Sequence, residues 1–119
     1  MKKPSPKQID LLFRVGLAGL FLANGIGAIV SPDDFKDPIS ANALASHIAS
    51  AGTLVHVIPV NDIALAAFIL LGKWRKVIAI WAVLWLLAVI YVTGFWTTDL
   101  IEHVGDLALV GYFYLSAKS

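Results

Sequence analysis

Residues 60–90 read VNDIALAAFILLGKWRKVIAIWAVLWLLAVI, with a long apolar run on either side of the short basic segment Lys73–Lys76. Extended outward, the two runs cover about residues 52–71 and 74–96. A helix rises about 1.5 Å per residue, so each run can cross a hydrocarbon core about 30 Å thick. This stretch therefore predicts two membrane-spanning helices joined by a tight basic turn.

Two more apolar runs lie outside this stretch, at about residues 9–30 and 99–115. Hydrophobic residues make up 59% of the 119-residue chain, and its mean hydropathy is +0.81, whereas a soluble domain is about 45–50% apolar. A soluble protein of this size would expose apolar patches that aggregate, but a bilayer accommodates them. We therefore predict an all-α integral membrane four-helix bundle, with residues 1–119 as a single transmembrane domain.

The distribution of charge predicts the orientation of the chain. Short loops enriched in Lys and Arg stay cytoplasmic, and the facing loops are mostly acidic, with the single lysine Lys36. Both the N-terminus and the C-terminus are therefore predicted to be cytoplasmic. In the first outer loop, apolar residues near helical spacing predict a short surface helix within residues 37–51. The basic residues on the predicted cytoplasmic side are Lys2, Lys3, Lys7, Lys73, Arg75, Lys76 and Lys118.

Two local features modify the predicted spans. Pro59 interrupts the second run, which predicts a kink there; alternatively the helix starts at Pro59 and is then too short to cross. In the first run Gly19, Ala23 and Gly27 recur every fourth residue. Such a face of small residues allows another helix to approach closely, and it predicts helix packing within the bundle.

Several polar side chains lie inside the predicted spans, where an ionisable group is costly unless it is paired, hydrated or neutral. Helical rise places the deepest of them in the outer half of the bundle. Two interpretations stay open: these groups hold the helices in register, or they form a proton-relay or ligand site. The candidate residues are Asn24, Asn61, Asp62, His103 and Asp106.

Arg14 lies in the cytoplasmic half of the first predicted span, away from the outer polar cluster. Its side chain either extends to the lipid headgroups or reaches a carboxylate as a charge partner. Trp81 and Trp85 lie one helical turn apart, and we interpret this stripe as packing or lipid contact rather than as a cofactor site.

Several kinds of chemistry are disfavoured by the sequence. The chain has no cysteine, which excludes disulfides and Cys-ligated metal clusters. It has neither a nucleotide fingerprint nor a basic cluster interleaved with aromatics, so no nucleic-acid partner is expected. His56 and His103 lie at similar depth without an accompanying haem motif, which makes haem an unfavoured cofactor. A metal site of His103, Asp106 and Asp62 has no supporting ligand spacing, so no metal is expected.

The run Leu11-Leu12-Phe13-Arg14-Val15-Gly16-Leu17, followed by Phe21 and Gly25, resembles the opening of DoxX-type membrane proteins. The second segment, from Asn61-Asp62 through Leu70-Leu71-Gly72 to Arg75, is also similar, with Asp62 where a glutamate is more usual. The resemblance implies a compact four-helix membrane bundle in which Arg14 and Asp62 are positions of interest. The name-giving members of that family resemble subunits of a thiosulfate:quinone oxidoreductase.

On this resemblance we expect a subunit or accessory component of a quinone-linked oxidoreductase assembly in a bacterial-type cytoplasmic (inner) membrane. Its expected partners are the lipid bilayer and other membrane or periplasmic subunits, and quinone is the implied cofactor. Because no complete catalytic set is present, the chain is not expected to be a catalyst by itself. Two alternatives remain: a non-catalytic structural subunit, and a small proton- or solute-coupled carrier that uses Asp62, His103 and Asp106.

Overall fold

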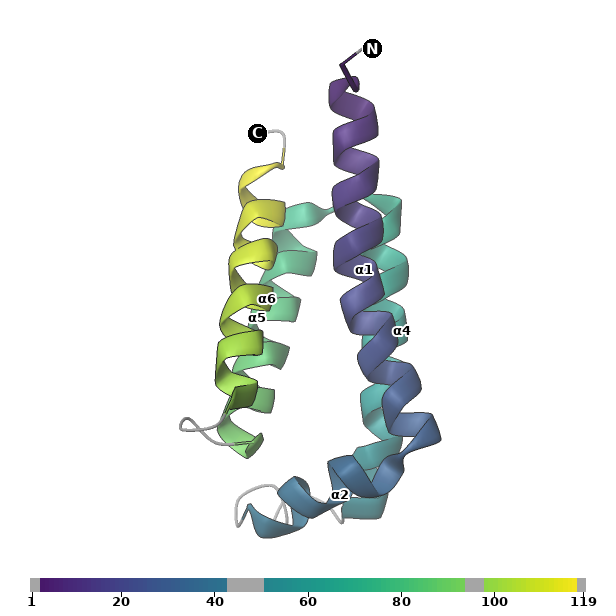
Figure 1. Ribbon diagram of the computed structural model, residues 1–119, viewed down its shortest axis with the longest axis vertical. Helices are drawn as coiled ribbons and strands as arrows, with labels where there is room; N and C mark the ends of the chain where they lie inside the picture. The colour runs from purple at the N-terminus through teal and green to yellow at the C-terminus, as the bar shows by residue number, and fades with distance from the viewer. Residues whose placement is uncertain (1–2, 43–50, 94–97, 118–119) are drawn as a thin grey trace.

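The computed structural model describes residues 3–42, 51–93 and 98–117 (Figure 1). Every regular element in this part of the chain is an α-helix, which confirms the predicted all-α class for the described residues. The helices are α1 (Pro6–Val30), α2 (Pro32–Ala41), α4 (Ala51–Leu71), α5 (Arg75–Thr93) and α6 (Thr98–Leu115).

Three of these helices, α1, α4 and α5, are long and apolar enough to cross a membrane. The protein is therefore a membrane protein with three candidate spans among the described residues. The helix α6 has 18 residues but is not one of the three. Its sequence contains three acidic residues, Asp99, Glu102 and Asp106, which lower its hydropathy.

The long helices form two pairs. The helix α1 packs mainly on α4, and α5 packs mainly on α6, while contacts between the pairs are fewer. Figure 1 shows three features at one end of the bundle: the start of α1, the end of α6 and the α4–α5 turn. The helix α2 crosses the opposite end, where it contacts α1 and α4.

The start of α1 is fixed by a capping box. The Ser5 hydroxyl accepts a hydrogen bond from the backbone N–H of Gln8 at 3.2 Å, and the Gln8 side chain accepts one from the Ser5 N–H at 2.8 Å. These bonds satisfy N–H groups that a helix end leaves unpaired, and Pro6 supplies a backbone angle suited to the first turn. The helix therefore begins before the predicted start at Ile9, which moves Asp10 from the first turn of the predicted span to the second turn of α1.

The second span continues through its proline. The helix α4 starts at Ala51, so the alternative start at Pro59 is wrong. Proline removes one backbone hydrogen bond, which membrane helices tolerate where a neighbouring helix packs closely. Pro59 is buried, and its Cα lies 3.5 Å from the position that a Cβ on Gly25 would occupy.

The close approach between α1 and α4 occurs at a different face from the predicted one. A Cβ built on Gly25 would lie 3.3 Å from the Cβ of Asp62 and 3.4 Å from Cγ1 of Ile63. By contrast, Gly19 and Ala23 are exposed, and a Cβ on Gly19 would meet nothing within 4 Å. Gly19 therefore makes no close helix contact of the kind that the spacing predicts, and it is Gly25 that meets α4. Ala23 lines the cavity between the helix pairs, and Gly27 is half-buried.

The short helix predicted within residues 37–51 begins earlier in the structure. The helix α2 starts at Pro32, directly after α1, with Asp33 and Asp34 in its first turn. Proline suits the first position of a helix, and acidic residues there are favoured by the helix dipole. Ile39 of α2 is buried. The rest of the predicted segment, residues 43–50, lies outside the described residues.

The apolar core lies between the two helix pairs and draws side chains from all four long helices. The outer faces of the bundle are also apolar: Leu12 and Ile101, for example, are each 74% exposed. Among the described residues, Asp62 is the one charged side chain that is buried, with no exposed surface. An apolar exterior around a buried carboxylate fits a lipid environment. The largest core side chains include Leu17, Phe21, Leu65, Ile69, Leu86 and Phe113.

Candidate functional site

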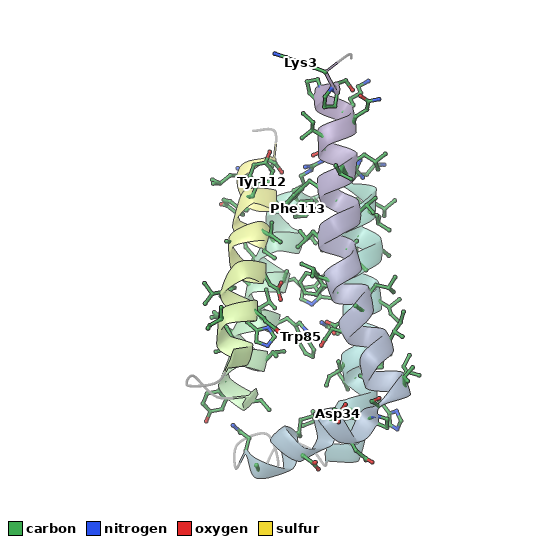
Figure 2. The ribbon with its side chains drawn as sticks, in the orientation of Figure 1. Lys3, Asp34, Trp85, Tyr112 and Phe113 are labelled. Carbon is green, nitrogen blue, oxygen red and sulfur yellow. The ribbon has the colours of Figure 1, made fainter. Side chains whose placement is uncertain are left out.

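A cavity of about 550 Å³ lies between the two helix pairs in the half of the bundle nearer α2. All four long helices contribute to its lining. Figure 2 shows the Trp85 side chain in the space between the α5–α6 pair and α1. The polar and aromatic lining residues are Phe21, Asn24, Asp62, Trp85, Glu102, His103 and Asp106.

The buried carboxylate of Asp62 is held by a chain of hydrogen bonds. Asn24 of α1 donates from Nδ2 to Oδ2 of Asp62, and the side chain of Trp85 also bonds to this carboxylate. Asn61 Nδ2 lies 3.5 Å from Oδ1 of Asp62, and Asn61 Oδ1 in turn accepts a bond of 2.9 Å from Trp81 Nε1. A buried carboxylate without such donors would be strongly destabilising. The chain therefore connects α1, α4 and α5 through polar contacts.

A second polar pair faces the same cavity from α6. The Nδ1 atom of His103 lies 3.7 Å from Oδ2 of Asp106, and the two side chains are 17% and 24% exposed. No hydrogen-bond partner for this buried Nδ1 exists among the described residues. Glu102, one residue earlier, also lines the cavity but is exposed. The imidazole and the two carboxylates thus lie across the cavity from Asn24 and Asp62.

The predicted candidate residues are therefore distributed unequally. One cavity is lined by Asn24, Asp62, His103 and Asp106. Asn61 does not line it, but its side chain contacts the Asp62 carboxylate. His56 is exposed and also does not line it. Within the described residues, no group of three His, Cys, Asp or Glu side chains is arranged to hold a metal ion.

Arg14 lies at the other end of the bundle in a separate cluster. Its Nε donates to Oδ2 of Asp10 at 2.9 Å, and its NH1 donates to the carbonyl of Leu70 at the end of α4. The carboxylate that Arg14 contacts thus lies toward the start of α1 and not inward at Asp62. The partner is Asp10, one turn earlier on the same helix, an i, i+4 spacing that allows direct pairing.

Arg75 makes the Asp10 cluster a junction between elements. Its two terminal nitrogens bond to the Asp10 carboxylate at 2.7 and 2.8 Å, while its Nε donates to the Gly72 carbonyl at 3.0 Å. It also donates to the Ser116 hydroxyl at 2.8 Å, and its guanidinium lies 5.2 Å from the Phe113 ring centre. Fork-shaped pairing of this kind fixes geometry as well as charge. The residue thereby ties α1, the α4–α5 turn and the end of α6 together.

Sequence reasoning missed Asp10, Arg75 and both tryptophans as members of polar clusters. The spacing of Asp10 and Arg14 is a readable signal, because residues four apart on a helix face each other. The indole N–H of Trp81 gives no such signal, since its polar atom is small beside its apolar ring. The interpretation of the Trp81–Trp85 stripe as packing or lipid contact alone is therefore incomplete.

Comparison with known proteins assigns the chain to a family. A family model described as methylamine utilisation protein MauE matches residues 6–101, from the start of α1 into α6. The expected resemblance to DoxX-type proteins is therefore wrong. The motifs that suggested it are short and mostly apolar, and lipid imposes such composition on membrane helices of many families. No curated protein and no solved structure matches the chain.

Proposed function

Because this chain belongs to the family of the methylamine utilisation protein MauE, we propose that it is an integral membrane accessory component of a methylamine-utilisation system. The match over residues 6–101 carries the proposal. It includes the three candidate spans, the Asn24–Asp62 contact and both members of the Asp10–Arg75 pair. We place the protein in a bacterial-type inner membrane, together with other membrane or periplasmic subunits.

The assembly that the protein serves is proposed to be an oxidoreductase. Releasing the nitrogen of methylamine by oxidation produces electrons that an acceptor must take up. A quinone is the proposed acceptor for that assembly, because it dissolves in the bilayer that surrounds the apolar outer faces of α1, α4 and α5. The chain itself is proposed to support this assembly rather than to catalyse the oxidation.

The proposed topology has four spans with both ends in the cytoplasm. An 18-residue helix such as α6 is about 27 Å long, close to the thickness of a hydrocarbon core. It packs along α5. The basic residues of the α4–α5 turn also favour the cytoplasmic side for the end where α1 begins.

The orientation in this topology has a direct test, because the chain contains no cysteine. Single variants Lys73→Cys and Asp34→Cys can be treated with a membrane-impermeant maleimide in intact spheroplasts. We expect Asp34→Cys to react from outside and Lys73→Cys to react only after permeabilisation. The reverse pattern would refute the orientation, and reaction of both in intact cells would refute the placement of the two ends on opposite sides.

The accessory function is tested by deletion and by purification. A strain that lacks the gene is expected to lose methylamine-dependent growth, and a tagged copy in mild detergent is expected to retain oxidoreductase subunits that mass spectrometry can identify. Growth of the same strain on a carbon source without an amine is the control. Unchanged growth on methylamine together with purification of the protein alone would overturn the proposal.

A second candidate function is a small proton- or solute-coupled carrier. The observation that favours it is the cavity, which has the buried Asp62 on one side and His103 with Asp106 on the other. Such groups inside a membrane are expensive to keep without a role. Vesicles containing the purified protein should then show pH-dependent flux that Asp62→Asn abolishes. Absence of flux above that of empty vesicles would remove this candidate.

A further inference from the structure

A second cavity, of about 740 Å³, lies at the basic end of the bundle, between the start of α1, the α4–α5 turn and the end of α6. We propose that this pocket binds a phosphate-bearing anion, which the membrane presents as the headgroup of an anionic phospholipid. The proposal is independent of the methylamine-related function. Its charged lining residues are Lys7, Asp10, Arg75 and Lys76.

The charge of the pocket is positive after its internal pairing is taken into account. Its one carboxylate, Asp10, is already bonded to Arg75 by two hydrogen bonds and to Arg14 by a third. Two guanidiniums therefore share one carboxylate. Within the described residues neither Lys7 nor Lys76 is in an ion pair, and the Lys76 ammonium lies 5.8 Å from the Tyr114 ring centre. An anion in the pocket would offset this excess positive charge.

The backbone adds to the same potential. The helix α1 begins at Pro6 and α5 begins at Arg75, so the positive ends of two helix dipoles lie at the pocket. Helix starts attract phosphate when basic side chains accompany them, as Lys7 and Lys76 do here. The Arg75 guanidinium is oriented in the pocket lining by hydrogen bonds to Asp10, Gly72 and Ser116.

The apolar part of the lining favours a lipid as the source of the phosphate. Trp74 is 64% exposed, and its ring meets Phe68 edge-on at 6.3 Å between ring centres. Val77, one turn along α5, lines the same pocket and is 66% exposed. Tryptophan concentrates at the headgroup level of membranes, and basic pockets between membrane helices bind anionic headgroups. The headgroup would lie among the basic residues and an acyl chain along Val77.

The test uses full-length protein in nanodiscs of phosphatidylcholine, with or without phosphatidylglycerol, and measures thermal unfolding and bound lipid by native mass spectrometry. The test variant is the double substitution Lys7→Gln, Lys76→Gln. The matched control is Lys73→Gln, because Lys73 is exposed on the same turn and does not line the pocket. A Lys7→Arg, Lys76→Arg variant preserves the charge and checks that the two positions tolerate substitution.

We expect phosphatidylglycerol to raise the unfolding temperature of the wild type, the Lys73→Gln control and the arginine variant. The double glutamine variant should bind phosphatidylglycerol with an affinity lower by about tenfold or more. Inorganic phosphate, added to discs of phosphatidylcholine alone, distinguishes the source: protection by phosphate to the same extent assigns the pocket to a free anion. No response to either anion, or an equal loss in Lys73→Gln, would overturn the proposal.

Discussion

The Asp10 carboxylate binds both terminal nitrogens of Arg75, at 2.7 and 2.8 Å, although 65 residues separate the two in the sequence. This contact joins α1 of one helix pair to α5 of the other. Direct packing between the pairs is sparser than packing within them. The relative position of the pairs therefore depends on this ion pair at one end and on the apolar core in the middle.

Asp10→Asn should destabilise the protein. The substitution removes the charge that two guanidiniums share, and it leaves Arg75 with a weaker partner. The Asp10 and Arg75 side chains are 31% and 15% exposed, so the loss should be about 1–2 kcal/mol, below that of a fully buried pair. Thermal unfolding in mild detergent measures it. Asp37→Asn, at an exposed site on α2 beyond its first turn, is the control, and equal melting of the two variants would contradict the prediction.

Gly72→Ala should also be destabilising, for a reason that lies in the backbone. Gly72 has φ of +70° and ends α4, with its N–H bonded to the carbonyls of Phe68 and Ile69. For a residue with a Cβ, this left-handed backbone conformation is less favourable by about 1–2 kcal/mol. The new Cβ would also lie 3.1–3.2 Å from the Arg14 side chain.

The control for this substitution is Gly111→Ala, because a Cβ there would meet nothing within 4 Å and the residue is helical. Alanine favours a helix over glycine, so this control should unfold at the wild-type temperature or slightly above it. A fall in its unfolding temperature equal to that of Gly72→Ala would show that the cost does not come from backbone conformation.

The helices themselves could be predicted from the sequence because their signals are local. Long apolar runs, the basic turn and the prolines give the positions of α1, α4 and α5 to within a few residues. The start of α1 differs because the Ser5–Gln8 capping box extends the helix past the apolar run, a signal that hydropathy does not contain. The difference bears on the Arg14 cluster: Asp10 lies at the edge of the predicted span but in the second turn of α1 in the structure.

The rotation of each helix could not be predicted in the same way. A membrane helix is apolar on its lipid side as well as on its packed side, so periodicity does not reveal which face is buried. For this reason the spacing of small residues predicts close packing at Gly19, whereas the structure has it at Gly25. Depth along the helix axis is independent of rotation, and it predicts that Asn24, Asp62 and Asp106 lie at a similar level, where the structure has the cavity that they line.

Gly25→Leu should separate α1 from α4. The Cβ position is already within 3.3 Å of Asp62 and 3.4 Å of Ile63, so a branched side chain cannot fit without moving the helices apart. Overpacking of this kind costs about 1–3 kcal/mol, and loss of the Asn24–Asp62 bond would add to it. Thermal unfolding of Gly25→Leu and Gly19→Leu compares the two faces of α1. Greater damage from the Gly19 substitution would contradict the packing face described for α1.

Substitution of Asn24 and Asp62, singly and together, should separate a structural role from a functional one. Asn24→Leu removes a donor and leaves the buried carboxylate undersatisfied, which should cost about 1–3 kcal/mol. The double variant Asn24→Leu, Asp62→Leu removes both polar groups, so its unfolding temperature should recover most of that loss. Simple addition of the two single costs would contradict a direct interaction.

If the pair only holds α1 against α4, the stable double variant should restore methylamine-dependent growth to the deletion strain. If Asp62 binds a ligand or a proton in the cavity, the double variant should be stable, expressed at the normal level and unable to restore growth.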